Sequence, residues 1–330
     1  MIRTYDDLGP FCKDESVACV VTIGNFDGLH EGHRCLLKEA DRMARSLSAG
    51  GVMPERRLLT FSPHPRQVLD DPDFRQIYTN CQREELVEET GLTDRMITAS
   101  FTPELMHTEP EDYVTKILKE RYGAVGVVVG DDFRFGNHGA GTSAYLKEIG
   151  EREGLTVRIV KRIVMDGDVV SSTRIRTLLE SGKMEEANRL LGRPYFVEGT
   201  VESGKHLGRS VGTPTINLKM NEERLVPLEG VYASRTVVDG EVWESISNVG
   251  TNPTFGDDLR TETYIFDFDR DLYGKTVRVE LLKFIRPEQK FESAEALRKQ
   301  LQTDIARTKD YFMQDQVSRG GTSPEKETDV

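Results

Sequence analysis

The stretch that decides the fold is Val17–His33, VACVVTIGNFDGLHEGH, in which an apolar run ends in a glycine-rich segment with two histidines. Residues 17–23 are mostly apolar and β-branched, which predicts a buried strand. Residues 35–47 repeat apolar side chains along one helical face, which predicts a helix. A strand that passes through glycines into a helix is the opening unit of an α/β fold.

The same alternation of strand and helix continues to about residue 191. The pattern predicts strands at 57–61, 95–101, 125–130 and 156–163, and helices at 84–90, 111–122, 143–153 and 176–181. Repeated strand–helix units imply a mainly parallel sheet with right-handed crossovers and helices on both faces. We therefore expect a Rossmann-like N-terminal domain whose ligands bind beyond the carboxyl ends of the strands.

After Gly192 the pattern changes to short strand-like runs separated by glycine, proline and aspartate. The predicted strands are 195–201, 215–220, 231–238, 242–249, 261–268 and 276–284. Six strands with almost no helix between them indicate an antiparallel sandwich or small β-barrel. Ser293 is a suitable N-cap for a closing helix over 293–312.

This change of pattern predicts two domains. We expect the α/β domain at 1–189, the barrel domain at 190–318, and a polar, disordered tail at 319–330. The chain contains no internal repeat.

Charge and cysteine content limit the classes of partner. Lys and Arg number 44 against 56 Asp and Glu, a formal charge of −12, which argues against broad binding to nucleic acid or to an anionic membrane. No apolar run approaches the roughly 18 residues of a membrane span, and the N-terminus lacks the pattern of a secretion signal. The four cysteines form neither a zinc motif nor a disulfide framework. We expect reduced thiols and a cytoplasmic protein, and the oligomeric state stays open.

The segment 24–33 is the first candidate site. His30 and His33 stand at a predicted helix start, where imidazoles and free backbone N–H groups can face one phosphate. A glycine-rich turn with exposed histidines is the plainer alternative, but this segment lies at the corner where open α/β sheets bind nucleotides. A zinc site is disfavoured, because there is no third ligand and no HExxH motif.

The run GNFDGLHEGH resembles the signature of the HxGH nucleotidyltransferases, in the form carried by bifunctional riboflavin kinase/FMN adenylyltransferases. FSPHP at 61–65, GDDFRFG at 130–136 and VSSTRIR at 170–176 resemble that family's further motifs. The resemblance implies that the FMN phosphate attacks the α-phosphorus of ATP, that His30 and His33 stabilise the transition state, and that Mg²⁺ neutralises the leaving pyrophosphate. The nucleotide-binding residues that it implies are Gly24, Asn25, Phe26, Asp27, Gly32, Asp132, Ser171, Ser172, Thr173 and Arg176.

The fourth motif also has a physical rationale. Its consecutive hydroxyls can cap the predicted helix 176–181 and donate to a polyphosphate, and Arg176 supplies charge. An ordinary helix cap is the alternative for the SST triplet alone. The chain departs from the family where a basic and an acidic residue are usual, because Gly139 and Thr142 stand there. That departure concerns the details of this loop, such as the adenylylation rate.

The second candidate site follows a false P-loop. Gly199–His206 nearly matches GxxxxGK[ST], but histidine replaces the Mg²⁺-binding hydroxyl and strands follow instead of a helix. The run 204–217, GKHLGRSVGTPTIN, can fold over phosphates, and Thr215 and Asn217 enter a strand on one face, where they can hold a metal–phosphate complex. A glycine-rich hairpin is the alternative. The loop glycines are Gly204, Gly208 and Gly212.

This run resembles the riboflavin kinase glycine loop and its PTAN motif, with Ile216 in place of alanine. Ile216 should point away from its two neighbours in a strand, so we expect it to be tolerated. Further matches are 227–232, 248–255, 271–275 and 284–288. The resemblance implies that Glu262 is the general base for the riboflavin 5′-hydroxyl. A surface glutamate is the alternative, since alternation alone does not decide which face of the strand is buried.

The two resemblances together imply one Mg²⁺-dependent enzyme that makes FMN from ATP and riboflavin, and then FAD and pyrophosphate from ATP and FMN. Two alternatives remain open. One is an enzyme with a single active half, and the altered loop makes the adenylyltransferase the half in question. The other is a regulator that binds flavin or nucleotide without turnover.

Overall fold

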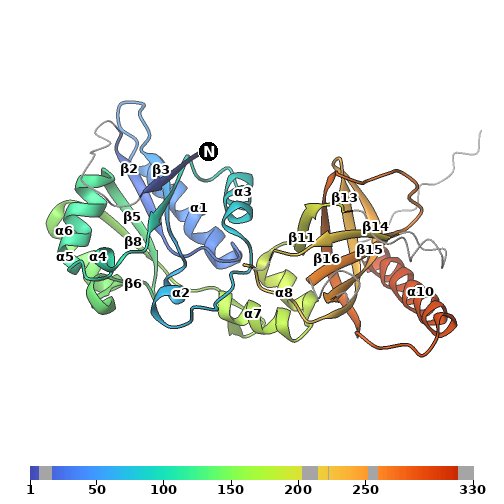
Figure 1. The fold of residues 1–330 in the computed structure, drawn as a ribbon. Coiled ribbons are helices and arrows are strands. Elements are labelled where there is room, and N and C mark those ends of the chain that lie inside the picture. The colour runs from blue at the N-terminus through green and yellow to red at the C-terminus, as the bar shows by residue number, and fades with distance from the viewer. Residues whose placement is uncertain (7–16, 203–214, 222, 252–258, 319–330) are drawn as a thin grey trace, which may run out of the picture. The chain divides into compact units, whose positions relative to one another are not determined.

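The structure is a computed structural model, and the residues that it describes are 1–6, 17–202, 215–221, 223–251 and 259–318. They form two compact units, shown in Figure 1: Met1–Ile175 with Glu223–Leu225, and Arg176–Glu222 with Val226–Val330. The predicted tail at 319–330 lies outside the described residues.

A six-stranded parallel sheet in the order β1-β4-β3-β2-β5-β8 forms the centre of the first unit. Its strands are β1 (Ile2–Asp6), β2 (Cys19–Ile23), β3 (Glu55–Ser62), β4 (Arg95–Ser100), β5 (Ala124–Gly130) and β8 (Thr156–Val160). The Rossmann-like parallel α/β fold predicted from the alternating pattern is confirmed. The edge strand β1 was not predicted.

Helices connect these strands. They are α1 (Glu31–Ser46), α2 (Pro65–Leu69), α3 (Asn80–Glu89), α4 (Pro103–Met106), α5 (Pro110–Asp112) and α6 (Ser143–Glu153). The helix predicted at 111–122 is instead the short α5 followed by a π-helix, η1 (Tyr113–Arg121). A 3₁₀ turn, η2, covers Asn137–Gly139. Two small hairpins pair β6 (Arg134–Phe135) with β7 (Gly141–Thr142), and β9 (Val164–Met165) with β10 (Asp168–Val169).

Both faces of the parallel sheet are buried, which explains why its strands are continuous apolar runs. Successive side chains of β2 point to opposite faces. Val20 packs in a cluster with Ala40 and Met43 of α1, whereas Val21 belongs to the cluster formed with η1 and α6. The sheet is thus the middle of three layers, and packing on both of its faces fixes the positions of its strands.

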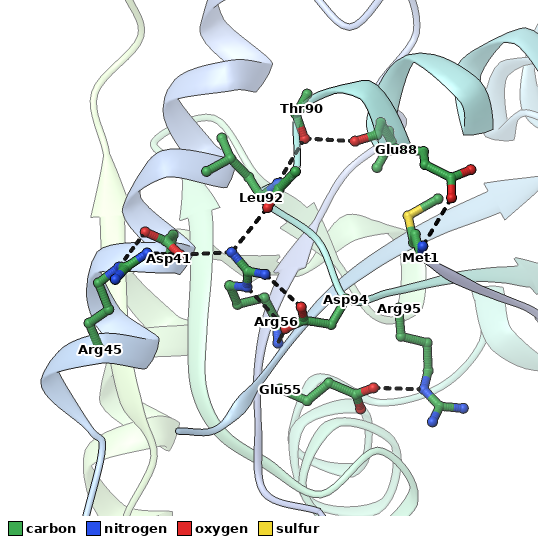
Figure 2. Close-up of polar contacts among 12 residues, drawn as sticks. Met1, Asp41, Arg45, Glu55, Arg56, Glu88, Thr90, Leu92, Asp94 and Arg95 are labelled. Carbon is green, nitrogen blue, oxygen red and sulfur yellow. Dashed lines mark hydrogen bonds and ion pairs between the residues drawn. The ribbon is translucent and has the colours of Figure 1, made fainter. Parts of the chain in front are cut away.

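An ion-pair network lies at the amino ends of the strands, away from the ligand edge expected for such a sheet. Figure 2 shows Arg56, at the start of β3, between Asp41 of α1 and Asp94 just before β4. Its Nη1 donates to Asp41 Oδ1 at 2.8 Å and its Nη2 to Asp94 Oδ1 at 2.6 Å. The hydrogen bond from Arg56 lowers the pKa of Asp94.

This network should stabilise the first unit in a pH-dependent way. Because the folded-state pKa of Asp94 lies below its ordinary value of 3.8, its contribution is complete above that pH and is lost as the pH falls through the lowered pKa. We expect Asp94→Asn to reduce the free energy of unfolding at pH 7 by about 1 kcal/mol, since the pair is partly solvated. Urea unfolding followed by circular dichroism at several pH values measures this.

The matched control is Asp112→Asn, because Asp112 pairs with Lys116 at 2.9 Å on an exposed surface. That change should alter stability by less than about 0.5 kcal/mol. A deficit in Asp94→Asn that does not shrink as the pH is lowered from 7 into the acid range would contradict the electrostatic explanation.

The second unit is built on an antiparallel sheet in the order β11-β16-β13-β14-β15-β12. Its strands are β11 (Tyr195–Thr200), β12 (Thr215–Lys219), β13 (Gly230–Val238), β14 (Glu241–Thr251), β15 (Leu259–Ile265) and β16 (Thr276–Pro287). The sheet curls until its ends meet, because Glu202 N donates to Asn217 O at 3.0 Å. The predicted small antiparallel barrel is confirmed.

Three helices belong largely to this second unit. They are α7 (Ser172–Glu180), α8 (Met184–Leu191) and α10 (Ala294–Ser318). Ser293 caps α10 as predicted, because its Oγ accepts from Ala296 N at 3.1 Å. Phe312 of α10 packs against Val231, Ile246 and Leu282 of the sheet. The structural units divide after Ile175, so most of α7 and all of α8 belong to the second unit. The predicted domain boundary lies later in the chain, near residue 190.

Candidate active sites

Three of the four sequence motifs follow neighbouring parallel strands. The signature starts at Gly24, directly after β2, and the motifs at Phe61 and Gly130 stand at the ends of β3 and β5. β3 and β5 flank β2 in the sheet. The chain passes from β2 outward on one side through β3 and β4, then returns to place β5 on the other side. The signature therefore lies at the topological switch point, where α/β sheets bind ligands.

The signature loop has an unusual backbone. Phe26 and Leu29 have φ values of 50° and 41°, in the left-handed region that non-glycine residues rarely adopt. The side chain of Phe26 is fully buried, and a Cβ at Gly24 would lie 3.3 Å from its ring. Asn25 turns its backbone carbonyl toward Thr60, whose Oγ1 donates to it at 3.2 Å. A strained backbone persists only where the surrounding structure fixes it, and such strain is common at functional sites.

The two histidines stack on each other at the start of α1. Their ring centroids are 3.6 Å apart with an interplanar angle of 16°. His30 is the N-cap of α1, and its Nδ1 accepts from His33 N at 3.3 Å. A neutral ring that accepts at Nδ1 carries its proton on Nε2, which can donate to a ligand. A Cβ at Gly32 would lie 3.0 Å from the His30 ring, so a larger residue there would require the imidazole to shift.

The fourth motif contacts the first across 145 positions of sequence. Ser172 Oγ donates to the backbone carbonyl of Asp27 at 2.9 Å. Ser171 Oγ accepts from Arg174 N at 3.2 Å and caps α7. The helix thus begins at Ser172, four residues before the predicted start at Arg176, because Ser171 is its cap. The carboxylate of Asp27 is buried and accepts from Ile77 N at 2.8 Å.

Three further residues were predicted to contact the nucleotide. Asp132, just after β5, is exposed and 4.0 Å from Arg162. Thr173 is exposed in the first turn of α7. Arg176 is buried on the same helix, beyond the division between the two units.

The two departures from the family pattern have local structural roles. Thr142 is the N-cap of α6, where its Oγ1 accepts from Tyr145 N at 3.1 Å. Gly139 has a φ of 67°, which favours glycine. A cap and a turn residue therefore occupy these two positions.

The second candidate site is a row of polar side chains across three strands. Glu262 of β15 pairs with Asn217 of β12 on one side and with Asn248 of β14 on the other. Thr261 and Thr263 are fully buried on the opposite face of β15. Glu262 is half-buried and lies on the other face, the side of the sheet that carries Tyr264 and α10. Alternation alone left open which face of β15 is buried, and the structure shows that the more deeply buried face is the one with Thr261 and Thr263.

Asn217 is suited to hold a cation. Its side chain is 6% exposed, and its Oδ1 is buried with no hydrogen-bond partner among the described residues. Thr215 lies two residues earlier on the same face. Ile216 pairs with Thr263 and therefore points the other way, as predicted. The glycines Gly204, Gly208 and Gly212 fall outside the described residues.

Two residues that contact the candidate sites, Asn248 and Ile77, were not predicted as site residues from the sequence. Asn248 Nδ2 donates to Glu288 Oε1 at 2.8 Å. Ile77 holds Asp27 only through its backbone N–H. Such a backbone contact leaves no signal in residue types, whereas Asn248 could have been found from its position in the matched stretch 248–255.

Within the ranges that the structure describes, no helix has both the length and the apolar content needed to cross a membrane. Over the same residues, no group of three or more His, Cys, Asp and Glu side chains could hold a metal ion. The three described cysteines, Cys19, Cys35 and Cys81, are not in disulfides.

Fold and site together define an α/β nucleotidyltransferase domain followed by a β-barrel kinase domain. A FAD synthetase family model matches residues 12–174, and a riboflavin kinase family model matches residues 191–312. The chain belongs to the bifunctional riboflavin kinase/FMN adenylyltransferase family.

Relatives resemble the chain over nearly its whole length. It is 33% identical over 308 residues to the bifunctional riboflavin kinase/FMN adenylyltransferase of Pseudomonas fluorescens, covering 93% of this chain and 96% of that one. It is 35% identical over 308 residues to the protein of the same name from Listeria monocytogenes, covering 92% and 96%. A solved structure from Streptococcus pneumoniae, named a macrolide-efflux protein, is 30% identical with a TM-score of 0.82, over 94% of this chain and 99% of that one.

Proposed function

We propose that this chain converts riboflavin to FMN in its barrel domain and FMN to FAD in its α/β domain, consuming ATP in both reactions. The observation that carries the proposal is the presence of a separate polar site in each domain, one at the switch point of the parallel sheet and one across β12, β15 and β14. Because both reactions use ATP, we place the activity in the cytoplasm. The proposed functional domains are 1–189 and 190–318.

In the α/β domain, the reaction joins a phosphate oxygen of FMN to the α-phosphorus of ATP while the bond to pyrophosphate breaks. This transfer needs positioning and charge stabilisation and no covalent help from the protein. We assign the stabilising role to the Nε2–H of His30 and to the stacked His33, at the amino end of α1, where the helix dipole also favours negative charge. Ser171, Ser172 and the loop carrying Asp27 complete the nucleotide site.

In the barrel domain, the riboflavin 5′-oxygen bonds to the γ-phosphorus of ATP while the bond from that phosphorus to ADP breaks. We assign to Glu262 the role of base that takes the hydroxyl proton. Its neighbour Asn217 and Thr215 would hold Mg²⁺, because a buried amide oxygen without a partner suits a cation that prefers oxygen ligands. When bound there, Mg²⁺ would neutralise charge on the transferred phosphate.

The Mg²⁺ assignment predicts a selective defect in Asn217→Ala. The Mg²⁺ concentration for half-maximal FMN formation should rise at least about tenfold, because one oxygen ligand is lost. FAD formation from supplied FMN should keep its Mg²⁺ dependence. Steady-state rates measured across a Mg²⁺ titration check both.

Ile216→Ala is the matched control, since Ile216 is the adjacent residue and points to the opposite face. It should leave the Mg²⁺ dependence of FMN formation unchanged. An equal shift in both variants, or none in Asn217→Ala, would remove Asn217 from the metal site.

One assay separates the proposal from its alternatives. Purified protein is incubated with riboflavin, ATP and Mg²⁺, and riboflavin, FMN and FAD are resolved by chromatography. The proposal predicts that FMN forms first and FAD follows. FMN that accumulates without FAD would mean that only the barrel is active, and the absence of both products would leave a protein that only binds flavin or nucleotide.

A further inference from the structure

Arg83 of α3 is a buried arginine whose hydrogen bonds reach the signature loop. Its side chain is 1% exposed. Nη1 donates to the backbone carbonyl of Asn25 at 3.0 Å and to Gln76 Oε1 at 3.2 Å, and Nη2 donates to Asn80 Oδ1 at 3.0 Å. The guanidinium therefore joins the start of α3 to the loop that follows β2.

The surroundings of Arg83 are unusual for a buried charge. Among the described residues, no carboxylate lies within ion-pair distance of it, and its acceptors are one carbonyl and two amide oxygens. Burial lowers its pKa, while the nearby charges of Asp27 and Glu84 oppose that effect. Removing an arginine from water is costly, so a residue whose only task was to fill this space would be apolar.

The carbonyl that Arg83 holds is at the point where the loop departs from ordinary geometry. Asn25 precedes Phe26, the first of the two non-glycine residues with positive φ. The same carbonyl accepts from Thr60 Oγ1. Two donors thus fix the peptide plane between Asn25 and Phe26, and a strained conformation persists only where its surroundings determine it in this way.

We infer that Arg83 is a positioning residue for adenylyl transfer: it keeps the signature loop in the strained form that places His30 and His33. This inference rests on the proposed roles of those two histidines. Transition-state stabilisation depends on donors held in place before the reaction, so a loop that relaxes should lose rate more than substrate binding.

The test is Arg83→Met, which keeps much of the side-chain volume and removes every donor. We expect kcat for FAD formation from FMN to fall about 100-fold, because removing or misplacing one transition-state donor has effects of this size. The KM for ATP should change less than tenfold. FMN formation by the same protein should be unchanged, and a cooperative unfolding transition followed by circular dichroism should show that the α/β domain is folded. Arg83→Lys should recover part of the lost kcat, since an ammonium can still donate to the Asn25 carbonyl.

Arg57→Met is the matched control. Arg57 is equally buried in the same unit, but it donates to the backbone carbonyl of Tyr122 at 2.9 Å and lies near the amino end of β3. The Arg57→Met variant should be less stable than the wild type but should keep the wild-type kcat for FAD formation. If Arg83→Met does not fold, Thr60→Val removes the second donor to Asn25 and should lower the same kcat by a smaller factor.

A loss of kcat in Arg83→Met but not in Arg57→Met, partly recovered by Arg83→Lys, supports the inference. An equal loss in both methionine variants, or wild-type kcat in Arg83→Met or in Thr60→Val, overturns it. His30→Asn is measured alongside: if that variant loses FAD formation while Arg83→Met does not, the proposed site stands and only the role of Arg83 fails.

Discussion

We expect FAD formation from FMN to fall about 10³-fold in His30→Ala, while FMN formation from riboflavin should continue at the wild-type rate. The magnitude is that of removing one donor that meets the charge developing in a transition state. The structure gives the physical reason: His30 Nδ1 is engaged by the His33 backbone N–H, so Nε2 carries the proton in the neutral ring. The measurement is the initial rate of each reaction, with FMN or riboflavin supplied separately.

His30 is also the N-cap of α1, so alanine removes a cap worth about 1 kcal/mol as well as a donor. His30→Asn separates the two effects, because asparagine is a good N-cap but does not reproduce the imidazole. The asparagine variant should keep wild-type thermal stability and still lose FAD formation. A full rate in His30→Asn would mean that capping, and not donation, explains the loss in alanine.

We expect FMN formation to fall by a factor of roughly 10² or more in Glu262→Gln, the range for loss of a general base, while FAD formation from supplied FMN should be unaffected. Glutamine matches glutamate in shape but cannot take a proton from the riboflavin hydroxyl. Its neighbours Asn217 and Asn248 are both amides, so the substitution should cause little disturbance in the row. The rates of the two half-reactions, measured separately, check the prediction.

Glu244→Gln is the control for this change. Glu244 is half-buried on β14, two residues before Ile246 and four before Asn248, and so lies on the same face of the sheet. It should leave FMN formation unchanged. Equal defects in Glu262→Gln and Glu244→Gln would point to a general effect of charge on this face and against a base at position 262.

Much of the fold could be predicted from the sequence, because both periodicities are clear. Apolar runs such as 125–130 have no polar alternation, which is the pattern of a strand buried on both faces, and β5 is such a strand. The edge strand β1 was missed because Ile2–Asp6 is exposed or half-buried along its length. Its pairing with β4 is made by the backbone, which residue types do not record.

The candidate sites were only partly predictable, because motifs name residues but not the contacts that hold them. His30, His33 and Asn217 could be chosen from their motifs. The role inferred for Arg83 could not, since its link to Asn25 spans 58 positions and ends on a backbone carbonyl. In the same way, α7 begins at Ser172 and not at Arg176 as predicted, because hydroxyl residues near a helix start can be either caps or residues of the first turn.

The central claim is that each domain carries its own complete site, and complementation between variants tests it most directly. His30→Asn and Glu262→Gln proteins are incubated with riboflavin, ATP and Mg²⁺, separately and mixed, and FAD is quantified over time. Neither variant alone should make FAD, because the first stops at FMN and the second does not reach it. The mixture should make FAD at a rate close to that of the slower half-reaction, as FMN released by one protein is adenylylated by the other. If the mixture made no FAD although the second variant accepted added FMN, or if either variant lost both activities, two independent sites would be ruled out.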